Sequence, residues 1–131
     1  MDNLDYANEL REVATEFKEL AFEYKKERAL YAEALNKLTT LIYVTGLHDD
    51  KASFENKLPK LLTTSKREEA KAYIEQLNTS RANYKGLEMV LESFKAHISA
   101  IQSVIKYNLT GEINTNIANK AAYTAEVQQF Y

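Results

Sequence analysis

The chain has 131 residues, a formal net charge of −2 and 45% hydrophobic residues, which fits one globular domain and excludes a disordered polyelectrolyte. No apolar run exceeds four residues, far fewer than the ~18 that span a bilayer, so no membrane partner is expected. Cysteine is absent, which excludes disulfides and thiolate chemistry, and the N-terminus lacks a signal-peptide pattern. We therefore expect a cytoplasmic protein, located in the host cytoplasm if it is viral.

Residues 4–45 are predicted to form one long helix, because the segment contains neither glycine nor proline and its apolar residues repeat every seven positions. Gly46 then supplies a helix C-cap. Residues 46–65 form a connector, which could contain a short amphipathic segment around Ala52 to Leu58 and in which Pro59 forbids a continuous helix. The repeat of the first helix is carried by Leu10, Phe17, Tyr24, Tyr31 and Leu38 at one heptad position and by Val13, Leu20, Glu27, Ala34 and Leu41 at the next.

Residues 66–109 are predicted to form a second long helix with a matching apolar stripe, which ends at Thr110-Gly111. Two helices of equal length and a short connector favour an antiparallel pair. Residues 112–131 are interpreted either as a short amphipathic helix that docks on the pair or on a neighbouring subunit, or as a frayed tail. The predicted fold class is therefore all-α: a long, coiled-coil-like antiparallel hairpin with a short C-terminal helix, oligomeric, in one domain of residues 1–131.

A second stripe lies on the back of the second helix, opposite its apolar face. Its residues are small and recur at spacings of three and four, a pattern that lets another backbone approach closely. The alternative is a solvated face that is low in charge. We predict an oligomer interface, in which the chain is its own partner, formed by Ala82, Gly86, Met89, Ser93, Ala96, Ala100 and Ser103.

Catalytic and metal-binding patterns are not found. The histidines, His48 and His97, have no partner at metal-ligand spacing, and three dispersed glycines cannot form a phosphate loop. No serine lies in a nucleophile motif. We therefore expect no catalytic residue, no metal, no cofactor and no enzymatic activity.

Basic residues cluster from the connector into the second helix, and the segment 57–67 contains no acid. Such a cluster is typical either of solvated surface or of a patch that binds nucleic-acid phosphates. Phe54 and Tyr73 lie close to this basic cluster in the sequence and could stack on unpaired bases. The predicted nucleic-acid-binding residues are Lys57, Lys60, Lys66, Arg67, Lys71, Arg81 and Lys85.

The order of these segments resembles a known family. The blocks from Ser65 to Tyr73, from Tyr84 to Glu88 and from Phe94 to Tyr107 are similar to small helical recombination mediators of tailed phages, the UvsY-like family. The resemblance implies an oligomeric phage protein that binds single-stranded DNA and assists recombinase loading. A non-enzymatic helical protein-binding module, such as a phage inhibitor of a host defence protein or a structural adaptor, is the alternative.

Overall fold

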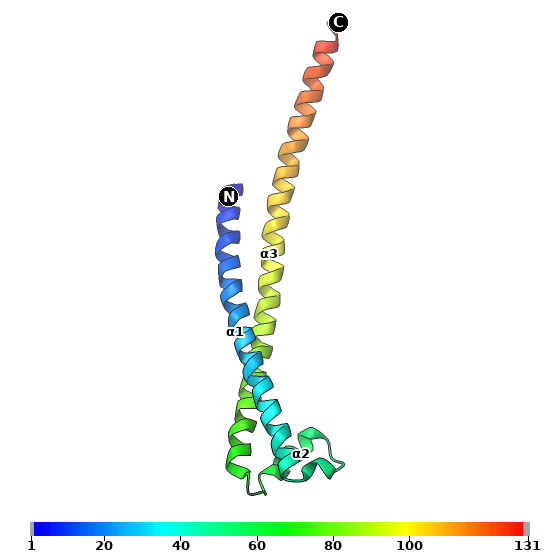
Figure 1. Ribbon diagram of the computed structural model, residues 1–131. Helices are drawn as coiled ribbons and strands as arrows, with labels where there is room; N and C mark the ends of the chain where they lie inside the picture. Colours follow the sequence, from blue (N-terminus) through cyan, green and yellow to red (C-terminus); the bar gives the residue numbers. More distant parts are fainter. Residues whose placement is uncertain (1, 130–131) are drawn as a thin grey trace. The chain divides into compact units, whose positions relative to one another are not determined.

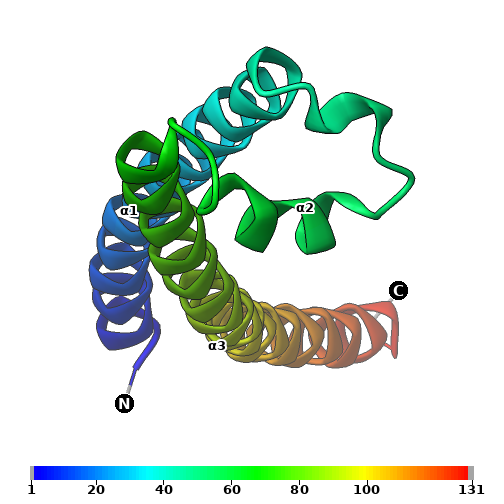
Figure 2. The ribbon, with the colours of Figure 1, turned by 90° about the horizontal axis from the view of Figure 1, so that it is seen from below.

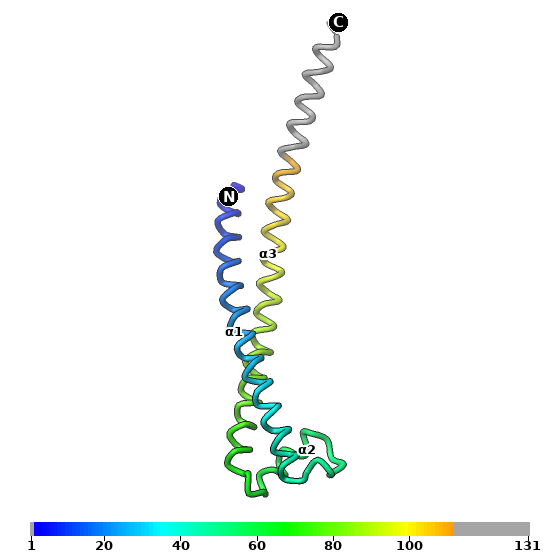
Figure 3. The backbone as a smooth tube through the Cα atoms, viewed as in Figure 1, coloured from blue at the N-terminus to red at the C-terminus, as the bar shows by residue number. Residues whose placement is uncertain are grey.

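A computed structural model describes the backbone of residues 2–129 and the side chains of residues 2–111 (Figure 3). Its elements are α1 (Asn3–Val44), a short 3₁₀ helix η1 (Leu47–Asp49), α2 (Phe54–Leu61) and α3 (Arg67–Gln129), and Figure 1 labels the three α-helices. The described backbone contains helices and no strand, so the all-α prediction is confirmed there. None of the described helices has a stretch long and apolar enough to cross a membrane.

The first helix ends where its sequence predicts. Gly46 adopts a left-handed conformation with φ of 79°, which residues with a Cβ rarely adopt. The Gly46 N–H donates to the carbonyl of Tyr43 at 3.1 Å, and the Thr45 N–H donates to that of Leu41 at 2.9 Å. These bonds satisfy carbonyls at the end of α1 and turn the chain into η1.

The connector contains α2, which overlaps the amphipathic segment around residues 52–58 that the sequence allowed and extends three residues beyond it. Ser53 caps this helix by accepting a hydrogen bond from the Asn56 N–H at 3.3 Å. Pro59 lies inside α2, where its missing N–H removes one backbone hydrogen bond, and the helix ends two residues later at Leu61. Proline is therefore tolerated here because few further helical bonds depend on it.

A predicted break near residue 109 is absent, and α3 is one element from Arg67 to Gln129. Gly111 does not adopt the positive φ that a glycine C-cap requires; among the described glycines only Gly46 does. A glycine within a helix costs only about 1 kcal/mol relative to alanine, and no proline follows to end the helix. The separate C-terminal helix of the prediction is thus part of α3, whereas docking of its side chains lies outside the described residues.

The chain divides into two compact units. A central unit comprises Lys18–Leu91, and a terminal unit comprises Met1–Phe17 and Glu92–Tyr131. In the central unit, α1 and α3 run antiparallel, because Leu30 accepts a hydrogen bond from Gln76 while Tyr24 meets Tyr84 further along. In the terminal unit, the pairs His97–Glu9 and Asn108–Asn3 follow the same antiparallel order.

The central unit contains a closed core because α2 covers the helix pair. Figure 2 shows the connector leaving the end of α1 and returning through α2 to the start of α3. The side chains of Leu38, Leu61 and Leu77 are fully buried, one from each of α1, α2 and α3. Two helices can bury only one stripe each, so the third helix is what closes this core. The buried cluster consists of Ala34, Leu38, Leu41, Ile42, Leu58, Leu61, Ala70 and Leu77.

Candidate nucleic-acid interface

All the basic residues predicted to bind nucleic acid lie in the central unit, on α2, on α3 or just before α3. Three of them form ion pairs within the chain. Lys60 pairs with Asp50, Lys66 with Glu69 at 4.0 Å, and Arg81 with Glu55 at 3.3 Å. A cation that is already paired is less available to a phosphate, so these three residues are weaker candidates for nucleic-acid contacts than their sequence pattern indicated.

The Lys60–Asp50 pair holds the connector against α2. The Lys60 ammonium donates a hydrogen bond to Asp50 Oδ2, and the Ala52 N–H donates to Asp50 Oδ1 at 2.8 Å. Chiefly because of the Lys60 bond, and then the Ala52 N–H, the pKa of Asp50 lies below its ordinary value of 3.8. The nearby Lys57 charge lowers the same pKa further.

Replacing Asp50 with asparagine is expected to lower the thermal midpoint of unfolding at neutral pH and to have little effect in acid. A carboxylate whose folded pKa is depressed stabilises the fold above its unfolded pKa, near 3.8 for this residue, and that contribution disappears as pH falls through the folded pKa. Circular dichroism melts of both proteins across the acid range test this. Equal midpoints at neutral pH would contradict it, and Asp49→Asn is the matched control.

Arg81 has a structural role in the central unit. Its guanidinium lies over the Tyr31 ring, with Cζ 5.7 Å from the ring centroid, while Glu55 pairs with its outer nitrogen. Tyr31 in turn packs edge-on against Tyr84, and the Arg28 guanidinium covers Tyr84 at 4.6 Å. This cluster joins α1, α2 and α3 through cation–π and aromatic contacts, so Arg81 stabilises the helix packing.

Four predicted cations remain: Lys57, Arg67, Lys71 and Lys85. Among the side chains of residues 2–111, none of the four forms an ion pair. Lys57 is half-buried, and the other three are exposed. On α3, spacings of four and fourteen residues bring these three onto one flank of the helix. They span about 27 Å at a rise of ~1.5 Å per residue.

The two aromatic residues that were predicted to stack on bases are not accessible for stacking, whereas a third aromatic residue is exposed. Phe54 and Tyr73 are half-buried and pack against the core, so neither is free to stack on a base. Tyr43 is 66% exposed, and its ring stacks on that of His48 with centroids 4.3 Å apart. The sequence placed Tyr43 in an apolar run, and only the turn at Gly46 brings His48 back onto it.

The predicted oligomer interface lies on the exposed back of α3 throughout. Ala82, Gly86 and Met89 are exposed in the central unit, and a Cβ added at Gly86 would meet nothing within 4 Å. The members in the terminal unit are equally exposed. This face of α3 is therefore accessible to a partner. Those terminal-unit members are Ser93, Ala96, Ala100 and Ser103.

The terminal unit carries a shallow, mainly apolar hollow of about 260 Å³, lined by Ser93, Phe94 and His97. His97 Nε2 lies 3.3 Å from Glu9 Oε1. Within the described residues, no three histidine, aspartate or glutamate side chains converge in a way that could hold a metal ion.

Comparison with protein families, with curated proteins and with solved structures gave no match.

Proposed function

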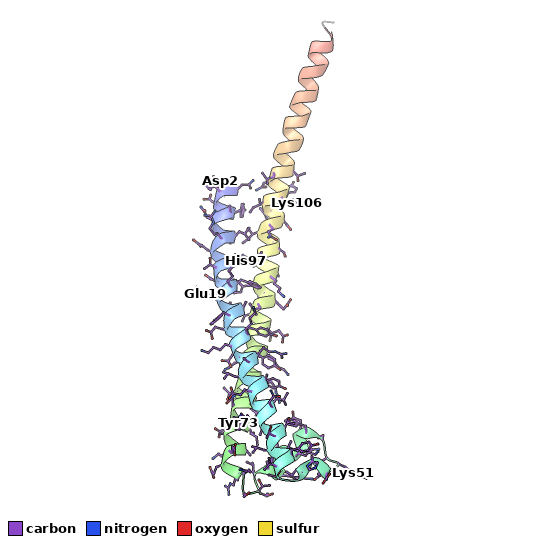
Figure 4. All side chains as sticks on the ribbon, in the orientation of Figure 1. Asp2, Glu19, Lys51, Tyr73, His97 and Lys106 are labelled. Carbon is purple, nitrogen blue, oxygen red and sulfur yellow. The ribbon has the colours of Figure 1, made fainter. Side chains whose placement is uncertain are left out.

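We propose that this protein is a non-enzymatic accessory factor of phage-type DNA recombination or replication that binds single-stranded DNA as an oligomer. The observation that carries the proposal is the flank of exposed cations Arg67, Lys71 and Lys85 on α3, with Lys57 on the neighbouring α2. Cations at this spacing can follow a flexible phosphate backbone without reading its sequence. The connector contributes one more exposed cation, Lys51, which projects at its outer edge (Figure 4).

Acidic neighbours limit the affinity that one chain can reach. Glu68 and Glu75 are exposed on the same part of α3, and the whole chain is slightly acidic. A weak site of a few phosphate contacts becomes effective when several copies bind one strand, because later contacts are intramolecular. The proposal therefore requires self-association, for which the exposed back of α3 is the candidate surface.

Replacing Gly86 with leucine is expected to dissociate the oligomer while leaving helicity intact. The introduced leucine side chain would project into open space in one chain, but it would prevent close approach of a second helix. Gly86→Ala is the matched control; it is expected to keep the assembly and to stabilise α3 by about 1 kcal/mol. Sedimentation velocity over a concentration series reports the result. A wild type that stays monomeric at the highest concentration would contradict self-association.

Assistance in recombinase loading is the finer part of the proposal. Glu19 and Glu23 are exposed on α1 in the central unit, where they form no ion pair among the described side chains, and such a surface is complementary to a basic partner protein. Reversing both charges is expected to remove partner binding and to leave DNA binding unchanged.

A titration of fluorescently labelled oligothymidine at low salt, followed by anisotropy, tests the proposed function. We expect saturable binding to the single strand that weakens as the salt concentration is raised. An anisotropy that stays flat to the highest protein concentration would refute the DNA-binding proposal.

Protein binding without DNA is the second candidate, and two observations favour it. Three of the seven predicted cations are paired internally, and Phe22 and Met89 are 68% and 75% exposed on the helices of the central unit. Isolation of the tagged protein from host lysate with and without nuclease separates the candidates. A partner protein retained after nuclease, together with a flat DNA titration, would favour the second.

A further inference from the structure

Tyr43 and His48 form an exposed stacked pair at the end of α1. Their rings are parallel within 3° and their centroids lie 4.3 Å apart. The left-handed turn at Gly46 produces this arrangement, since it sends η1 back so that His48 covers one face of Tyr43. His48 Nε2 lies 3.4 Å from Asp49 Oδ1, which helps to hold the imidazole in place.

The Tyr43 ring remains accessible although His48 covers one of its faces. The residue is 66% exposed, which requires that much of the ring is open to solvent. Exposing an aromatic ring to water costs free energy unless a ligand covers the ring. Parallel stacking on His48 also fixes the orientation of the Tyr43 ring. The pair is therefore a rigid platform for a flat, unsaturated group.

Charges around the platform favour a base that carries a phosphate. Asp49 is exposed and acidic, but the charge of Asp50 is balanced by Lys60. Lys57 lies close enough to lower the pKa of Asp50, and Lys51 follows in the connector. In the connector that follows the platform, Asp50 pairs with Lys60 and Glu55 pairs with Arg81, so among the described side chains the unpaired charges of residues 50–60 are the two cations Lys51 and Lys57, while Asp49 lies against His48.

We propose that the free face of Tyr43, backed by His48, stacks on one unpaired base of a bound single strand. This inference rests on the proposed function, and it adds a residue and a binding mode to the electrostatic site. Stacking predicts that the protein binds DNA that has bases more tightly than an abasic strand of the same length and charge. Phosphate contacts alone would not make that distinction.

The test compares oligothymidine with an abasic strand of the same length, by anisotropy at low salt. Stacking on one aromatic side chain changes affinity by about 5- to 150-fold. We expect the wild type to prefer oligothymidine by a factor in this range, Tyr43→Ala to lose the preference, and Tyr43→Phe to keep it. Phe22→Ala, which removes another exposed ring of α1, is the matched control and is expected to keep the preference.

The outcomes separate the two proposals. If the wild type binds both strands equally, or if Tyr43→Ala retains the preference, the stacking inference is overturned while DNA binding stands. If Tyr43→Phe loses as much preference as Tyr43→Ala, the hydroxyl rather than the ring is responsible, and stacking is again overturned. If neither strand binds, both proposals fall. Circular dichroism of each variant confirms that helicity is unchanged.

Discussion

Replacing Leu61 with alanine lowers the free energy of unfolding by about 2–5 kcal/mol, the usual effect of truncating a fully buried leucine. Leu61 is fully buried, and it packs in one cluster with Leu38 of α1 and Leu77 of α3. The loss combines reduced apolar burial with the cavity left between three helices. Because α2 is short, this residue is a large part of what holds it against the helix pair.

Leu62 provides a neighbouring control of the same residue type. It lies just beyond α2 and is 37% exposed, so Leu62→Ala is expected to cost less than about 1 kcal/mol. Urea denaturation of all proteins at one chain concentration measures the difference, since self-association would otherwise shift the midpoints. Equal losses for the two variants would show that α2 is not packed as described.

Reversing Arg67 and Lys71 together is expected to weaken single-stranded DNA binding at least about tenfold at low salt, because two phosphate contacts become two repulsions. Both residues are exposed, and a glutamate at Arg67, in the first turn of α3, would interact favourably with the helix dipole, so the fold should tolerate the change. The same reversal at Lys60 would be less informative, since it would also break the pair with Asp50.

The matched control for this prediction is Lys25→Glu with Lys26→Glu. These lysines are exposed on α1 in the central unit, and their reversal changes the net charge by the same amount. Anisotropy titrations measure the DNA affinity of both double variants, and the comparison shows whether the loss is specific to this flank or follows from net charge alone. If the control weakens binding as much as the Arg67 and Lys71 variant, the proposed flank is not the binding site.

The long helices could be predicted from the sequence because each carries an apolar repeat through several turns. The heptads of residues 4–45 match α1 closely, and Gly46 ends it in the predicted way. The end of the second helix could not be predicted, because Gly111 fits either a C-cap or a helix interior, and only its backbone conformation separates the two. A short amphipathic segment around residues 52–58 could be predicted, but its continuation through Pro59 to Leu61 could not, because proline usually ends a helix.

The basic residues of the candidate site could be predicted from the sequence, but their ion pairs with acidic residues could not. A basic run between residues 57 and 67 is visible in the sequence, yet Asp50 lies ten positions from Lys60, and Glu55 lies 26 from Arg81. Such pairs form only when α2 packs against its neighbours, so sequence spacing cannot reveal them. The Tyr43–His48 stack cannot be predicted from sequence spacing either, because it depends on the turn at Gly46, whereas the residues of the predicted oligomer interface are exposed on the back of α3.

The salt dependence of oligothymidine binding by the wild type tests the central claim most directly. If Lys57, Arg67, Lys71 and Lys85 each neutralise one phosphate, the logarithm of the association constant falls with the logarithm of salt concentration with a slope of about −3 per bound chain. A slope close to zero, or no binding even at the lowest salt, would contradict a nucleic-acid interface on this flank of α3.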